Sequence, residues 1–131
     1  MALRLETEAS PACLDAVHEL LAQLWAQRPD AGADARARFT TAVAELVANV
    51  VEHGRTAAGR PPRLVLSLAA APGAVVADLE DDGIEVPPVP PAPGDPLAES
   101  GRGVALAAAA VDELSYARAD GRNRWHVVLR A

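Results

Sequence analysis

Three short polar segments carry the residues that could bind a ligand or catalyse a reaction, in a chain that is otherwise rich in Ala, Val and Leu. Residues 45–53 contain a carboxylate, an amide and an imidazole at regular spacing. Residues 80–83 are three acids followed by a glycine, and residues 100–104 place an arginine between two glycines. Each pattern alone is common. Together they offer fixed carboxylates, a buried amide and a glycine-rich backbone that an anion can approach.

The first segment predicts a polar column on one face of a helix. Glu45, Asn49 and His53 are spaced i, i+4 and i+8, which stacks them along that face. A different face of the helix carries the apolar stripe expected to be buried, formed by Val43, Leu46, Val47 and Val50. An amide inside an apolar helix is costly unless its hydrogen bonds are satisfied. An amphipathic helix with a solvated polar face remains the alternative.

The other two segments predict turns. Asp81-Asp82-Gly83 follows an apolar run and, by itself, also fits an ordinary acidic turn. Gly101 and Gly103 precede an Ala-rich stretch, and the N-terminus of a helix presents free N–H groups to an anion. Arg102, between these glycines, either meets that anion or faces solvent. The segment is not a Walker loop, because the chain has no lysine.

The elements that must position these segments follow from periodicity and turn residues. A strand is expected over 2–8, then a helix capped by Ser10 that ends near Arg28. A second helix should run from Asp34 to His53, with Gly54 as its stop. Hairpins are expected at 63–70 with 74–80 and at 113–119 with 123–130, and a helix at 103–112 between them. This order predicts a two-layer α/β sandwich, with helices on one face of a mostly antiparallel sheet.

Composition narrows the functional classes. The chain of 131 residues fits one domain over 1–131, and its net charge of −6 argues against nucleic acid as a partner. Every fixed cation is an arginine. Because Cys13 is the single cysteine, no intrachain disulfide can form. We expect Cys13 to be a core residue. Neither a secretion signal nor a membrane-length apolar run is evident, so we expect a cytoplasmic protein that contacts no membrane.

In order and spacing, the three segments resemble the N-box and the two glycine boxes of the GHKL ATPase superfamily. The small size is similar to the anti-sigma-factor serine kinases of the RsbW type. This resemblance implies the Bergerat fold, with three helices on one face of the sheet and a lid loop at about 84–100. Two positions depart from the family pattern: Glu85 stands where a second glycine is usual, and Glu99 where an arginine is often found.

The resemblance also implies an ATP site with Mg²⁺. Glu45 matches the general base, Asn49 the Mg²⁺ ligand, and His53 a histidine near the phosphates. Asp81 matches the aspartate that accepts the adenine amino group, with Gly83 close to the base. The phosphates would be held by Gly101, Arg102 and Gly103.

The implied function is an ATP-dependent protein serine/threonine kinase. It would phosphorylate a STAS-domain anti-anti-sigma protein and hold a sigma factor, and the family often forms homodimers. The alternative is a catalytically inactive GHKL module that senses nucleotide or binds protein, which Glu85, Glu99 and a proline-stiffened lid favour. Glu45 favours catalysis, because a mere binder needs no base. A detached histidine-kinase half and a scaffold without ligand are further alternatives.

Overall fold

The computed structural model describes residues 2–85 and 98–131, with the side chains of 98–102 excepted. The described residues form five strands and three helices. In chain order these are β1 (Leu3–Glu8), α1 (Cys13–Gln27), α2 (Ala33–His53), β2 (Arg63–Ala71), β3 (Ala74–Asp81), α3 (Ala98–Ala110), β4 (Glu113–Ala119) and β5 (Arg122–Arg130). Among them, no helix is both long and apolar enough to cross a bilayer.

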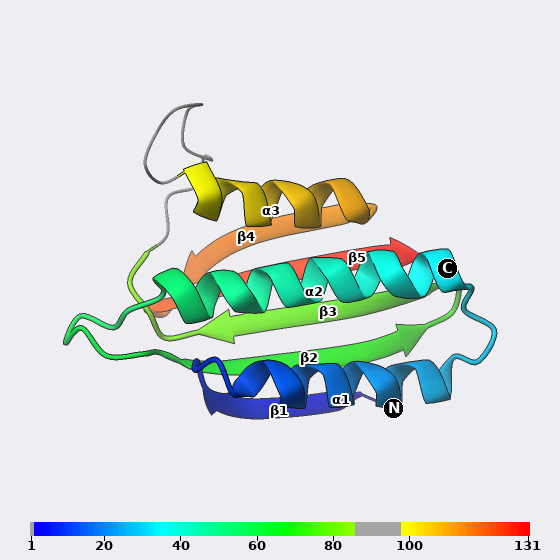
Figure 1. Cartoon of the computed structure of the whole chain (residues 1–131), viewed down its shortest axis with the longest axis horizontal. Coiled ribbons are helices and arrows are strands. Elements are labelled where there is room, and N and C mark those ends of the chain that lie inside the picture. Colours follow the sequence, from blue (N-terminus) through cyan, green and yellow to red (C-terminus); the bar gives the residue numbers. More distant parts are fainter. Residues whose placement is uncertain (1, 86–97) are drawn as a thin grey trace.

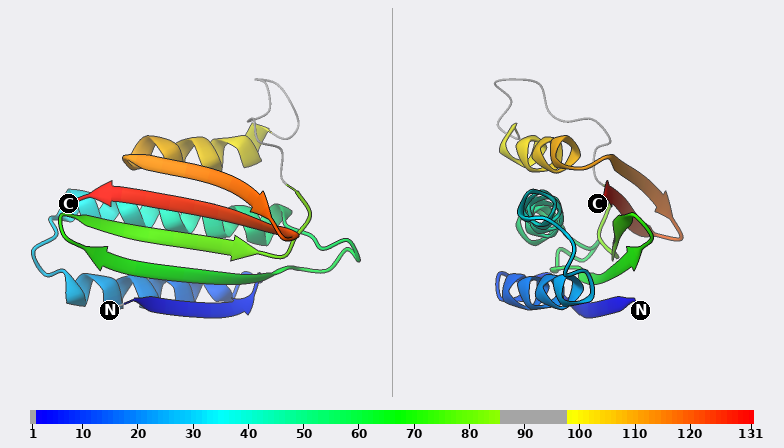
Figure 2. Two further views of the ribbon diagram at one scale, coloured as in Figure 1. Left: turned by 180° about the vertical axis from the view of Figure 1, so that it is seen from behind. Right: turned by 90° about the vertical axis from the view of Figure 1, so that its right-hand side faces the viewer.

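The strands form one antiparallel sheet in the order β1-β2-β3-β5-β4. All three helices lie on the same face of it, with α2 over the middle (Figure 1). None of the helices of residues 2–85 and 98–131 lies on the opposite face (Figure 2). The burial pattern of the strands reflects this difference between the two faces: in β5, buried residues alternate with more exposed ones. The predicted two-layer sandwich with three helices on one face of an antiparallel sheet is confirmed.

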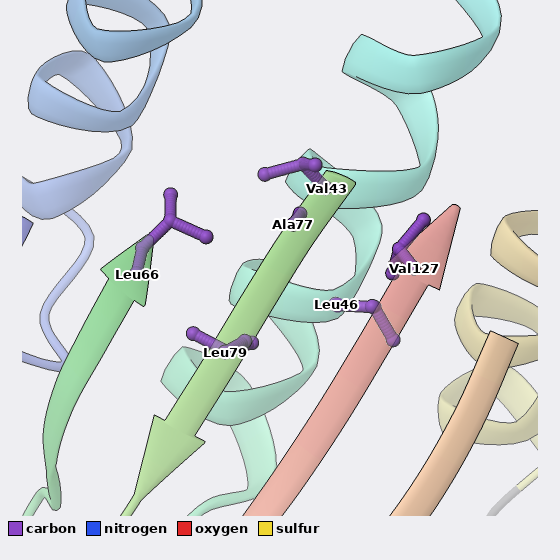
Figure 3. A pocket seen from close by; sticks show the side chains of 6 residues that line it. All are labelled: Val43, Leu46, Leu66, Ala77, Leu79 and Val127. Atoms are coloured by element: carbon purple, nitrogen blue, oxygen red, sulfur yellow. The ribbon is translucent and has the colours of Figure 1, made fainter. Parts of the chain in front are cut away.

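The core between α2 and the sheet is aliphatic. Six apolar side chains from α2, β2, β3 and β5 face one another there (Figure 3): Val43, Leu46, Leu66, Ala77, Leu79 and Val127. Because each buried methylene contributes about 0.8 kcal/mol, this layer holds α2 firmly on the sheet. It offers no polar group to a ligand. Its role is to fix the rotation of α2, and therefore the direction of that helix's polar column.

Turn chemistry explains both hairpins. Gly73 joins β2 to β3 with a φ of +70°. Asp120 and Gly121 join β4 to β5 with φ values of 55° and 73°, and two positive values in succession are typical of a type I′ turn. Gly54 ends α2 as expected, but with a φ of −68°. Its lack of a side chain matters for a different reason, since a Cβ there would lie 2.5 Å from the Val50 carbonyl oxygen.

Two predicted helix starts are wrong. The first helix begins at Cys13 rather than at Pro11 behind a Ser10 cap, because Ser10 and Pro11 form a turn whose carbonyls accept the N–H groups of Cys13 and Leu14. The third begins at Ala98, about five residues before the expected start, so Gly101 and Gly103 are helical and do not form a turn ahead of the helix. The proline-rich loop and most of the expected lid lie outside the described residues.

Candidate functional site

The predicted site residues come from elements that meet at one end of the sandwich. The C-terminal ends of α2 and β3 lie there beside the N-terminal ends of α3 and β5, at the left of Figure 1. The α2 and α3 helices run in opposite directions and pack closely. The fold therefore brings the three polar segments, which are far apart in sequence, to a common region.

In the polar column of α2, Glu45 faces α3. Glu45 and Asn49 are half-buried, and His53 is the exposed last residue of the helix, 3.5 Å from the carboxylate of Glu52. A Cβ placed on Gly103 would lie 3.1 Å from Oε2 of Glu45. The first and third segments thus touch, and glycine at position 103 leaves the space that the Glu45 carboxylate occupies.

Asp81 is the most buried acid of the site, with 3% of its surface exposed. Its Oδ1 accepts hydrogen bonds from the backbone N–H of Gly83 at 2.9 Å and from Nδ2 of Asn123 at 3.0 Å. Burial raises the pKa of the Asp81 carboxyl above its ordinary value of 3.8, and these two hydrogen bonds and the Arg118 charge act in the opposite direction. Within the described residues no donor bonds to Oδ2, so that oxygen is open to a ligand from this part of the chain.

The turn after Asp81 is held on both sides. The backbone N–H of Ile84 donates to the carbonyl of Arg55 at 2.7 Å, and Oδ1 of Asp82 accepts the N–H of Arg63 at 2.8 Å. Gly83 is buried, and a Cβ there would lie 2.9 Å from Oδ1 of Asp81 and 3.1 Å from the Arg55 carbonyl oxygen. Glycine is therefore the residue that lets this turn close over Asp81.

Asn123 is a site residue that the sequence interpretation missed. It is 1% exposed, and its carboxamide joins Asp81 to Tyr116 and Arg118. A signal was present, because Asn123 occupies an inward position in a strand whose other inward residues are Trp125, Val127 and Leu129. A polar residue at such a position needs hydrogen-bond partners inside the fold.

Gly101 and Arg102 lie in the first turns of α3, and their side-chain surroundings lie outside the description. Among the described residues, no three His, Cys, Asp or Glu side chains cluster to hold a metal ion. A Mg²⁺ ion near Asn49 would therefore take one amide oxygen from α2 and most of its ligands from phosphates and water. Mg²⁺ commonly binds in this way, so the donor set fits the ion.

Comparisons with known proteins agree with this arrangement. A search of curated proteins found no match. Among solved structures, the RsbU and RsbW domains of Rv1364c from Mycobacterium tuberculosis align with 99% of this chain at a TM-score of 0.72 and 24% identity. This chain spans 32% of that solved chain. The histidine kinase AdeS from Acinetobacter baumannii aligns with 98% of this chain at a TM-score of 0.51 and 14% identity. The alignment covers 67% of the solved AdeS chain.

These two likenesses concern the fold. The family model named "Histidine kinase-like ATPase domain" matches residues 7–130, which is nearly the whole chain and includes all three polar segments. The resemblance to the GHKL ATP-binding domain is thereby confirmed, and an ATP-binding domain is what such a match implies. The chain belongs to the histidine kinase-like ATPase domain family.

Proposed function

We propose that this protein binds ATP with Mg²⁺ and transfers the γ-phosphoryl group to a serine of a STAS-type anti-anti-sigma protein. In the same proposal it acts as an anti-sigma factor when that partner is absent. The observation that carries the proposal is the contact between Glu45 and Gly103, because the carboxylate proposed as the base lies against the glycine segment. The fold likeness to a protein with an RsbW domain supports the choice of partner class.

The base of the nucleotide would lie at Asp81. Oδ1 of Asp81 is held by Gly83 and Asn123, so Oδ2 is the oxygen that would accept the exocyclic amino group of adenine. The phosphates would lie between α2 and the start of α3, near Gly101, Arg102 and Gly103. When bound beside Asn49, Mg²⁺ would neutralise charge on the phosphates. His53, at the end of the same column, would lie near them.

In the chemical step, the protein has to accept one proton. Glu45 would take the proton of the serine hydroxyl as its oxygen forms a bond to the γ-phosphorus. The bond from that phosphorus to the bridging oxygen breaks, and ADP leaves with the electron pair. Positioning and charge neutralisation dominate such reactions, so the placement of Glu45 matters more than any change in its chemistry.

Calorimetric titration with ATP, with and without Mg²⁺, tests the binding part. Asp81→Asn should abolish binding, because an amide replaces the oxygen acceptor pair. Asp78→Asn is the matched control, since Asp78 lies three residues earlier on β3 with its side chain 61% exposed. Asn49→Ala should remove the Mg²⁺ dependence. Wild-type protein that is folded but binds no nucleotide at millimolar concentration would refute the proposal.

Phosphotransfer to a STAS-domain protein tests the catalytic part. Glu45→Gln should retain ATP binding and lose transfer by about a hundredfold or more, because general-base catalysis contributes on that order. Glu19→Gln, at an exposed position of α1, is the control.

The second candidate is an inactive GHKL module that senses nucleotide or binds protein. Glu85 favours it, because an exposed carboxylate stands directly after the Asp81 turn where the family pattern has glycine. Wild-type protein that binds ATP but transfers no phosphate to any STAS-domain protein, and that equals Glu45→Gln in every assay, would support this candidate.

A further inference from the structure

Asn123 uses its whole hydrogen-bonding capacity on the protein. Its Nδ2 donates to Oδ1 of Asp81 at 3.0 Å and to the carbonyl of Ile84 at 2.9 Å, with the Gly83 carbonyl at 3.4 Å. Its Oδ1 accepts from the Tyr116 hydroxyl and from Nη1 of Arg118. A carboxamide has two donor hydrogens and an oxygen with two lone pairs, so this side chain is saturated.

The surroundings leave one orientation for the Asn123 amide. A flipped amide would turn its oxygen toward the Asp81 carboxylate and two carbonyl oxygens, and its N–H groups toward the Arg118 guanidinium. The first change places acceptor against acceptor, and the second places donor against donor. An aspartate at this position would suffer the same repulsion. Serine is shorter and has a single donor, so it could not reach both sides. The position therefore calls for an amide.

The strand pairing sets this side chain in a row across the sheet. Asp81 of β3 lies opposite Asn123 of β5, and Asn123 lies opposite Arg118 of β4. Nη1 of Arg118 also donates to the Gly83 carbonyl at 3.0 Å. Residues of three neighbouring strands thus converge on the Asp81 carboxylate and on the backbone carbonyls of Gly83 and Ile84.

We propose that Asn123 is a positioning residue for the base end of the nucleotide site, pinning the Asp81 carboxylate in one orientation and tying Gly83 and Ile84 to β5. The proposal rests on the proposed ATP binding for its functional consequence. Oδ1 of Asp81 is occupied by the protein, and Oδ2 is presented to the ligand because Asn123 prevents the carboxylate from rotating. The Asn123 amide also offsets burial, which opposes the charged form of Asp81 and raises its pKa.

Two variants and one control test this role. Asn123→Leu keeps the side-chain size and removes every hydrogen bond. Tyr116→Phe removes one hydroxyl that donates to Asn123, and it serves where Asn123→Leu fails to fold. Arg124→Ala is the control, because Arg124 is the next residue of β5, with its side chain 49% exposed and in ion pairs with Glu80 and Asp120.

The first measurement needs no nucleotide. Carboxyl-carbon NMR follows the titration of Asp81, and hydrogen exchange follows the Gly83 and Ile84 amides. In Asn123→Leu, Asp81 should titrate at higher pH than in wild type, and both amides should exchange faster. Tyr116→Phe should move in the same direction by less, and Arg124→Ala should match wild type. An unchanged titration and unchanged exchange in the two network variants would overturn the proposal.

The second measurement is the pH profile of ATP affinity. Asn123→Leu should weaken binding by about tenfold to a hundredfold, as expected for a hydrogen bond to a charged group, and the loss should grow as the pH falls. A loss that is the same at every pH, without a shift in the Asp81 titration, would mean general structural damage and would refute the positioning role. Wild-type protein that binds no ATP while the variants still shift the titration would refute the proposed function alone.

Discussion

Replacing Gly103 by alanine sets helix propensity against the position of Glu45. Gly103 lies within α3, and alanine stabilises a helix interior by about 1 kcal/mol relative to glycine. The new methyl carbon would lie 3.1 Å from Oε2 of Glu45, where ordinary contact begins near 3.4 Å. The carboxylate must therefore retreat by about 0.3 Å. Pushing a side chain away from its preferred rotamer costs about 0.5–1.5 kcal/mol, so the two effects nearly cancel.

A double-mutant cycle separates these contributions. In the wild-type background, Gly103→Ala should change the free energy of unfolding by less than about 0.5 kcal/mol. In a Glu45→Ala background the nearest atom among the described residues is the backbone carbonyl oxygen of residue 45, at 3.9 Å. The same change should then stabilise by about 1 kcal/mol. The coupling energy is then about 0.5–1.5 kcal/mol, within the usual range for residues in contact. Urea unfolding of the four proteins measures it.

The matched control for propensity is Ala108→Gly, at an exposed position of the same helix. It should destabilise by about 1 kcal/mol whether Glu45 is present or absent. The cycle depends on no assumption about function. Full stabilisation by Gly103→Ala in the wild-type background, with no coupling to Glu45, would refute the placement of Glu45 against Gly103. If Glu45 is the base, as proposed, its displacement should lower the phosphotransfer rate by about fourfold, since a 1 Å error can cost about a hundredfold.

Two further predictions concern stability. Asp81→Asn should resist urea better than wild type near neutral pH. Because the pKa of Asp81 is raised, the folded protein binds the carboxyl proton more tightly than the unfolded chain does, and wild-type stability falls as the pH rises from 3.8 through the folded pKa. The advantage of the variant should therefore vanish below pH 3.8. An advantage that is independent of pH would contradict this reasoning. Gly54→Ala should destabilise by about 1–3 kcal/mol, because its Cβ would overlap the Val50 carbonyl oxygen. Gly32→Ala has open space at the N-cap of α2 and should cost less than about 1 kcal/mol in urea unfolding. Equal effects of the two glycine changes would show that the helix end relaxes freely.

The parts of the fold that were predictable are those set by local patterns. The column of Glu45, Asn49 and His53 follows from helix periodicity, and both hairpins follow from their glycine turns. The start of α1 was misplaced because Ser-Pro is equally suited to a helix cap and to the turn that forms here. Local pattern alone did not distinguish these two uses.

The missing parts of the site depend on contacts between distant residues. Asn123 meets Asp81 across 42 positions of sequence, through a strand order that no local pattern reveals. Gly103 was assigned to phosphate binding, and its contact with Glu45 depends on how α3 packs against α2. Residue types therefore indicated the chemistry, while the pairing of elements determined which side chains support it.

The strand order has a consequence for how the chain acquires its structure during synthesis. β5 follows every other element in the chain, yet it lies inside the sheet, between β3 and β4. A growing chain on the ribosome can pair β1, β2 and β3, but β4 has no partner strand until β5 emerges. Asn123 emerges with β5, so the support of Asp81 is among the last features to form. Contacts of such long sequence separation are slow to close. Nucleotide binding in this architecture would thus report that folding has proceeded through β5.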